Sequence, residues 1–226
     1  MEIICENYLD DVFDKSEYIK FYPFIGKKYK EISPKILVLG ESHYFPPNVT
    51  DIEMKEFDNE KLTSRIVLLG EYISEIRENG THPCQYIRCY RYTAAMITGK
   101  DYHFSDYIWN YLSFFNFFQK HAGRGSKGKE FIDEILIENS QRAYFEIINI
   151  LKPKLVIAWG STDLYNKWVP RNDRDPIEDY LYKYKKYPDT VIWHIQHPSR
   201  GFDYKWYHEE FKRITKENNI DISKLV

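Results

Sequence analysis

The fold of this 226-residue chain is decided by the segment Lys35-Ile36-Leu37-Val38-Leu39-Gly40-Glu41-Ser42-His43-Tyr44. Its apolar first half predicts a short strand that is buried on both faces, as in the centre of a parallel sheet. Gly40 ends the strand, at the edge where open α/β sheets bind ligands and where a missing side chain lets the backbone approach one. Because polar residues follow directly, we expect functional side chains at this turn.

Three later segments repeat the apolar pattern and predict buried strands at residues 112–118, 155–160 and 190–195. Apolar positions at helical spacing predict helices over residues 6–22, 59–77, 86–97, 131–151 and 203–217. Residues 170–189 are polar and weakly patterned, which predicts a loop with a short helix. Alternating strands and helices imply an α/β fold of three α/β/α layers around a central parallel sheet of about four strands. With no linker-like stretch, residues 1–226 are expected to form a single domain.

The composition limits the class of protein. A formal net charge of -2 is unlike that of a generally cationic nucleic-acid binder, although basic clusters occur locally. Cys5, Cys84 and Cys89 match neither a zinc site nor a disulfide framework, which favours a reducing compartment. Since no secretory signal and no long apolar run is found, we expect a cytoplasmic protein that does not enter membranes. No metal or cofactor is predicted, and the sequence leaves the oligomeric state open.

The ends of the predicted strands carry polar residues. Asn116 lies among phenylalanines in the second strand, Ser161 follows the third, and His197 and Ser199 follow the fourth. A buried amide without partners costs about 1–3 kcal/mol, so Asn116 either bonds backbone in a turn or faces a ligand. The carboxyl ends of parallel strands meet at one edge of a sheet, and these residues are therefore expected to line one crevice with Gly40.

This order of motifs resembles the uracil-DNA glycosylase superfamily, including a divergent bacterial branch of it. In that superfamily the first strand ends in Gly-Gln-Asp-Pro-Tyr-His or Gly-Glu-Ala-Pro-Gly, the second delivers an asparagine, and the last exits through His-Pro-Ser. The matching residues here are Gly40-Glu41-Ser42-His43-Tyr44, Asn116 and His197-Pro198-Ser199, in the same order. The segment at residues 155–160 is also similar to that superfamily's Leu-Leu-Trp-Gly strand.

The resemblance implies a uracil-DNA glycosylase-like fold and hydrolysis of the N-glycosidic bond of uracil or a related damaged base in DNA, single- or double-stranded, after base flipping. His197 would donate a hydrogen bond to the departing base, with Glu41 and Ser42 completing the catalytic set. The implied substrate-binding residues are Gly40, His43, Tyr44, Asn116 and Ser199. The implied contacts to the nucleic-acid backbone come from Ser161, Arg200, Lys127 and Lys129, with Phe202 as a wedge into the base stack.

Two departures bear on activity. Ser42 stands where the best-known members carry an aspartate that activates water, and a hydroxyl is not a base near neutral pH; Glu41 is the candidate to take that role. The branches with an iron–sulfur cluster use four cysteines, so no cluster is expected here. A nucleic-acid-binding module without activity therefore stays open. So do structural roles: His197 bonded to backbone, Ser199 as a helix cap and Glu41 as a surface carboxylate.

Two other functional classes match parts of this sequence. Gly-Glu-Ser after a strand resembles the Gly-Asp-Ser block of a lipase and esterase superfamily, with Ser42 as nucleophile and His197 as base, but the late Asp-x-x-His of that group is absent. Residues 123–129 have the glycine and lysine spacing of a phosphate-binding loop. Glu130 replaces the Ser or Thr that would hold magnesium, which favours a flexible basic loop.

Overall fold

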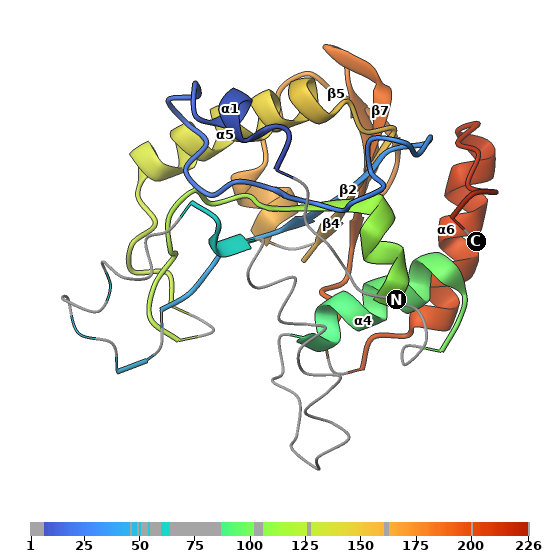
Figure 1. The fold of residues 1–226 in the computed structure, drawn as a ribbon, viewed down its shortest axis with the longest axis horizontal. Helices are drawn as coiled ribbons and strands as arrows, with labels where there is room; N and C mark the ends of the chain where they lie inside the picture. Colours follow the sequence, from blue (N-terminus) through green and yellow to red (C-terminus); the bar gives the residue numbers. More distant parts are fainter. Residues whose placement is uncertain are drawn as a thin grey trace.

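A computed structural model of the chain describes residues 7–45, 47–48, 50, 54, 60–63, 87–101, 106–125, 128–160, 163–199 and 201–225. A mixed sheet of seven strands, in the order β1-β3-β2-β4-β7-β6-β5, forms its centre (Figure 1). The strands are β1 (Phe24–Ile25), β2 (Ile36–Gly40), β3 (Leu112–Asn116), β4 (Leu155–Trp159), β5 (Arg174–Glu178), β6 (Leu181–Tyr184) and β7 (Tyr187–Ile195). Strands β3, β2, β4 and β7 are mutually parallel, whereas β1 pairs antiparallel with β3, and β6 pairs antiparallel with both β7 and β5.

The α/β class predicted from the sequence is confirmed, but the sheet is larger than predicted and is not wholly parallel. The four predicted strands correspond to β2, β3, β4 and β7. The additional strands lie at the two ends of the sheet. The hairpin β5–β6 replaces the loop and short helix predicted over residues 170–189, because β5 is an edge strand of exposed residues that contains Pro176 and shows no buried period.

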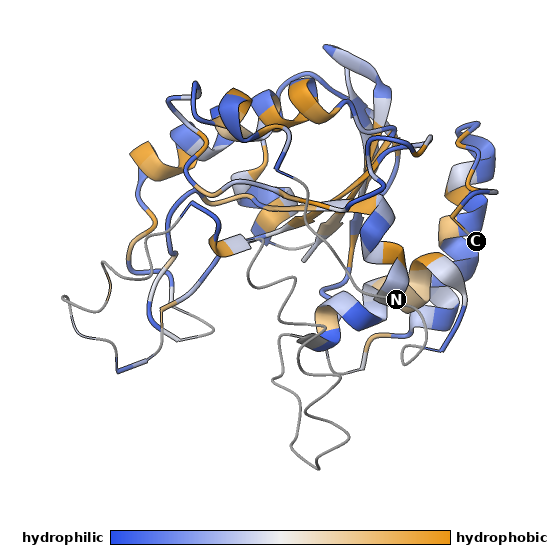
Figure 2. Ribbon diagram, in the orientation of Figure 1, coloured by the Kyte–Doolittle hydropathy of each residue, from blue (hydrophilic) through white to orange (hydrophobic). Residues whose placement is uncertain are grey.

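Helices cover both faces of the sheet (Figure 1). Helix α5 (Glu134–Leu151) packs on one face, and α4 (Ile87–Thr98) and α6 (Tyr204–Glu217) pack on the other. The shorter helical elements are α1 (Asp10–Phe13), the 3-10 helix η1 (Asp106–Tyr111) and the π-helix η2 (Leu164–Trp168). Apolar residues concentrate on the central strands and on the inward sides of these helices (Figure 2). No helix within the described ranges is long and apolar enough to cross a membrane.

The helices predicted at residues 86–97, 131–151 and 203–217 are present as α4, α5 and α6. The side chain of Asp133 caps α5 by accepting a hydrogen bond from the backbone N–H of Leu136, and Asp203 caps α6 in the same way. The helix predicted over residues 59–77 lies outside the described residues except at 60–63.

The helix predicted over residues 6–22 is wrong, since only the four residues of α1 are helical. The Ser16 hydroxyl accepts hydrogen bonds from the backbone N–H groups of Tyr18 and Ile19, which offers the backbone an alternative to the helix. The side chain of Gln119 accepts from the N–H groups of Lys20 and Phe21. These contacts hold the chain in a non-helical course.

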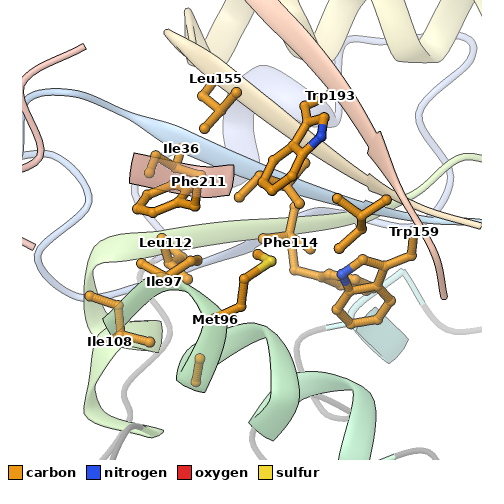
Figure 3. Close-up of a cluster of buried hydrophobic side chains, with 14 of the residues drawn as sticks. Ile36, Met96, Ile97, Ile108, Leu112, Phe114, Leu155, Trp159, Trp193 and Phe211 are labelled. Carbon is orange, nitrogen blue, oxygen red and sulfur yellow. The ribbon is translucent and has the colours of Figure 1, made fainter. Parts of the chain in front are cut away.

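The register of the parallel strands decides which residues share a face. Gly40 pairs with Asn116, and Trp159 pairs with Ile195. Alternate residues of each strand belong to the core beneath α4 and α6, which includes Phe114 and Trp159 at its far end (Figure 3). The carboxyl ends of β2, β3, β4 and β7 therefore bring Gly40, Asn116 and Trp159 to the α4 face.

Candidate functional site

Gly40 and Asn116 lie side by side at the ends of β2 and β3. A Cβ atom on residue 40 would collide with Oδ1 of Asn116 and would lie 2.8 Å from Cζ of Phe114. Glycine is required there because the neighbouring strand's side chains fill the space. The predicted proximity of these two residues is thus present.

The side chain of Asn116 contacts His43, another predicted site residue. Nδ2 of Asn116 lies 3.1 Å from Nε2 and 3.3 Å from Nδ1 of the His43 ring, and Nε2 also lies 2.9 Å from the hydroxyl of Thr63. Burial, with a smaller contribution from His121, lowers the pKa of His43 to about 3. The imidazole is therefore neutral at pH 7, and the Asn116 amide is bonded to a side chain, which neither sequence-based alternative included.

The segments that follow β2 and β3 continue side by side beyond the sheet. Five backbone hydrogen bonds of 2.8–3.0 Å join them: Phe117 N to Gly40 O, Phe118 N to Glu41 O, Ala122 N to His43 O, Phe45 N to Gly123 O, and Gly125 N to Phe45 O. His121 stacks on Phe45 with ring centres 3.8 Å apart. The basic glycine-rich loop is thereby attached to the turn after Gly40.

Ser42 is bonded to the backbone of this same region. Its hydroxyl donates to the carbonyl of His43 at 2.7 Å and accepts from the N–H of Ala122 at 3.1 Å. A serine nucleophile needs its hydroxyl against a base, and these contacts are with amide groups. The geometry of Ser42 gives no support to the serine hydrolase alternative.

Glu41 has its contacts on the other side of the sheet. Its carboxylate lies 3.5 Å from Nζ of Lys129 and accepts a hydrogen bond of 3.2 Å from the hydroxyl of Tyr44, whose pKa is raised by burial and then by Glu41. Lys129 also pairs with Asp163 and lies over the ring of Trp168, which packs against the α5 side of the core. Glu41 is thus a partly buried ion-paired carboxylate directed away from the α4 face.

His197 lies on the α4 face. Its Nδ1 is 3.9 Å from Sγ of Cys89, in the first turn of α4, and its ring meets that of Trp159 edge-on with centres 6.0 Å apart. The residue keeps an exposed portion, while burial of the rest lowers the pKa of the imidazole. Among the described residues its ring therefore lies against a thiol and an indole and makes no hydrogen bond to backbone, unlike the structural alternative.

Ser199 is exposed and its hydroxyl is 3.4 Å from the carbonyl of His197. It does not cap α6, because Asp203 does. Trp159 is 4% exposed and its Nε1 has no hydrogen-bond partner among the described residues. Figure 3 shows Trp159 at the end of the core cluster beside Phe114. The His197 end of the sheet edge therefore combines two exposed polar side chains with a buried indole N–H that has no partner in the described part of the chain.

The glycine-rich loop holds an anion from its own chain. Oε1 of Glu130 accepts a hydrogen bond of 2.7 Å from the N–H of Arg124, and the Cα of Gly123 packs so closely that an added Cβ would collide with the carboxylate. Hydrogen bonds from the N–H groups of Glu130 and Arg124 lower the pKa of this carboxyl group. The position that a phosphate would take in a phosphate-binding loop is occupied by Glu130.

The predicted contacts to a nucleic-acid backbone are described only in part. Ser161, Arg200 and Lys127 lie outside the described residues, and Lys129 is paired with Glu41 and Asp163. Phe202 is buried and stacks on Tyr207 with ring centres 4.5 Å apart, so the expectation that it forms an exposed wedge is wrong. Its phenyl ring is part of the hydrophobic core beneath α6.

Two cavities lie away from this edge. One, of about 410 Å³, is bounded by residues around α1 and by Glu60 and Lys61; the other, of about 370 Å³, lies between the β5–β6 hairpin and α6. Neither is lined by a predicted site residue. Within the described part of the chain, no three His, Cys, Asp or Glu side chains group as metal ligands would.

Two contacts of the site were missed from the sequence. The sequence shows Cys89 only as a cysteine outside any zinc or disulfide pattern, whereas in the structure it is a free thiol that contacts His197. Trp159 is predicted only as a strand residue, although it has the same strand parity as Leu155 and Ile157 and so belongs to the α4 face. A search for polar or aromatic residues at the same strand parity as Asn116 would have found it.

No protein-family model matches this chain, and a search of curated proteins returns no match.

Proposed function

We propose that this chain is a uracil-DNA glycosylase-like protein that hydrolyses the N-glycosidic bond of a damaged or deaminated base in DNA. The observation that carries the proposal is the placement of an amide, Asn116, and an imidazole, His197, on one face of the sheet at the carboxyl ends of its parallel strands. Gly40 lies between their strands. β2 and β4 lie between β3 and β7, so the two outer strands are about 14 Å apart.

The charge state of His197 suits this chemistry. Breaking an N-glycosidic bond places negative charge on the departing base, and a donor aimed at its oxygen stabilises that charge. A neutral imidazole still carries one N–H that can donate a hydrogen bond to that oxygen. Since burial lowers the pKa of His197, the neutral form is favoured at pH 7. His197 is the group that we assign to the leaving base.

Asn116 would recognise the base by hydrogen bonding to it. Uracil presents a carbonyl acceptor beside an N–H donor, and a side-chain amide offers the complementary pair. In the structure Nδ2 of Asn116 contacts the His43 ring, so pairing with a base would exchange that contact for one with the ligand. His43 and Thr63 would then keep their own contact at 2.9 Å.

A binding module that lacks cleavage is the second candidate, and one observation favours it. Water activation needs a base beside the sugar, yet Glu41 is paired with Lys129 and Tyr44, and Ser42 is bonded to backbone. In the described residues neither group is joined to His197. Cleavage would therefore be weak or restricted to bases that leave easily.

The test uses oligonucleotides that carry uracil, hypoxanthine, xanthine or a thymine mismatch, single-stranded and duplex, with alkali-labile breaks as the readout. We expect weak cleavage of a narrow set of bases, reduced at least about 100-fold in His197→Ala, a loss of the size seen when one charge-stabilising donor is removed. His208→Ala is the matched control, because it removes a histidine of α6 whose Nδ1 lies 2.7 Å from the carbonyl of Met96.

The variants separate the candidates. Equal cleavage by wild type and His197→Ala would remove His197 from the mechanism. Binding in a gel-shift assay without abasic sites would select the module, and neither binding nor cleavage of any oligonucleotide would overturn both. Glu41→Gln tests the remaining carboxylate and is expected to lower cleavage only if Glu41 leaves its pair with Lys129.

A further inference from the structure

His197 is held between two side chains of the α4 face. Cys89 lies on its Nδ1 side, with Sγ and Nδ1 3.9 Å apart, and Trp159 meets the ring edge-on. Cys89 is 6% exposed and belongs to the first turn of α4, which packs on the same core as Trp159. The thiol is thus a fixed neighbour of one ring nitrogen, while His197 as a whole remains exposed.

The charge states of the pair decide which group donates. Burial raises the pKa of the Cys89 thiol to about 12, so the sulfur carries its proton at neutral pH. Burial lowers the pKa of His197, so its ring is neutral and has one nitrogen that accepts. An imidazole nitrogen is a good acceptor, whereas a thiol sulfur is a weak one. The pairing that uses both groups best is S–H to Nδ1.

We propose that Cys89 is a positioning residue that holds His197 in the tautomer with the proton on Nε2, and so turns an N–H donor toward the ligand edge of the sheet. The catalytic use of this donor rests on the proposed function, whereas the tautomer itself does not. In the opposite tautomer Nε2 would be an acceptor, and it would repel the carbonyl oxygen of a departing base. The thiol therefore decides whether the edge presents a donor or an acceptor.

The test measures the His197 tautomer directly, by ¹⁵N chemical shifts of ring nitrogens in histidine-labelled protein at pH 7.5, with His197→Gln to assign the signals. Wild type is expected to show Nε2–H predominantly. In Cys89→Ala, loss of a hydrogen bond worth about 1 kcal/mol should lower the ratio of the Nε2–H to the Nδ1–H form about fivefold. Cys89→Ser keeps a donor and should keep the wild-type tautomer. Thr93→Val is the control for a buried change in the same helix that leaves the Cys89 contact in place.

Activity is measured on the same variants. We expect kcat in Cys89→Ala to fall in proportion to the measured fraction of His197 in the Nε2–H form, with KM unchanged and with recovery in Cys89→Ser. A wild-type ring protonated on Nδ1, or the same tautomer ratio in wild type and Cys89→Ala, would overturn the proposal. A tautomer shift without any glycosylase activity would sustain the positioning role of Cys89 and count against the proposed reaction alone.

Discussion

The ends of β2 and β3 differ from the ends of β4 and β7, although all four lie at the same edge of the sheet. At the β2/β3 end, Asn116, His43 and Thr63 are bonded to one another, and five backbone hydrogen bonds join the segments that follow. At the β4/β7 end, His197 and Ser199 are exposed, and Nε1 of Trp159 has no partner in the described ranges. The polar side chains at the first end are hydrogen-bonded to one another, whereas the second end includes an indole N–H without a partner in the described residues. The difference indicates that a ligand would have to displace the contact between Asn116 and His43 at the first end, whereas it would meet the exposed side chains of His197 and Ser199 directly at the second.

The largest effect expected from this comparison is that of adding one methyl group at each end. Gly40→Ala should lower the free energy of unfolding by about 3 kcal/mol, because the new Cβ meets Asn116 and Phe114 in a packed core. Gly160→Ala, at a φ of +85° with open space around it, should cost about 1 kcal/mol from backbone strain alone. Urea unfolding of the two variants measures both values, and equal losses would contradict the contrast between the ends.

A second effect concerns acid. The folded state binds a proton on His43 only near pH 3, and the unfolded chain binds it near 6.5, so stability is lost as pH falls from 6.5 toward 3. Between pH 7 and pH 5 His43 should account for a loss of about 2 kcal/mol. His43→Gln should remove that part of the slope, measured by urea unfolding at pH 7, 6 and 5.

His197→Gln is the matched variant at the other end. Because His197 is exposed, its substitution should change this slope less than His43→Gln does. His194 is also buried, with its pKa lowered to about 3, and it contributes equally to the pH dependence of the unfolding free energy in both variants. A slope that is the same in wild type and His43→Gln would show that the ring is not buried in a neutral form.

The smallest expected effect is a difference in stability between variants of two tryptophans that belong to the same core. Nε1 of Trp109 donates to the carbonyl of Tyr90 at 3.2 Å, whereas Nε1 of Trp159 has no partner in the part of the chain that the structure describes. Trp109→Phe should therefore cost about 1 kcal/mol more than Trp159→Phe, since the volume lost is the same and only one variant loses a hydrogen bond. Thermal unfolding measures the difference. A larger cost for Trp159→Phe would mean that its indole N–H is bonded in the folded protein.

The central strands could be predicted because each is a run of apolar residues long enough to be distinctive. β1 has two residues, and β5 is exposed along its length, so neither carries such a pattern. The failure of the predicted N-terminal helix depended on Gln119, which is far from it in sequence and bonds its backbone. Local pattern cannot include a partner supplied by the fold.

The candidate site was predictable to the level of strand ends and no further. Strand parity places Asn116 on the α4 face and can be read from the sequence, whereas His197 lies two residues beyond β7 and is placed by its contact with Cys89. The direction of Glu41 and His43 could not, because each lies in a turn whose course depends on hydrogen bonds to residues 117–125. The contact of Cys89 with His197 joins residues 108 positions apart and follows from how α4 packs.

The Glu130 carboxylate gives the glycine-rich loop a tethered counter-anion. An external phosphate would compete with a group whose effective concentration at the loop is on the order of millimolar or above, simply because it is attached a few residues away. The change Glu130→Ala would remove this acceptor from the backbone N–H of Arg124. Residue 130 is thus the position at which a substitution is expected to alter most directly what the loop can bind.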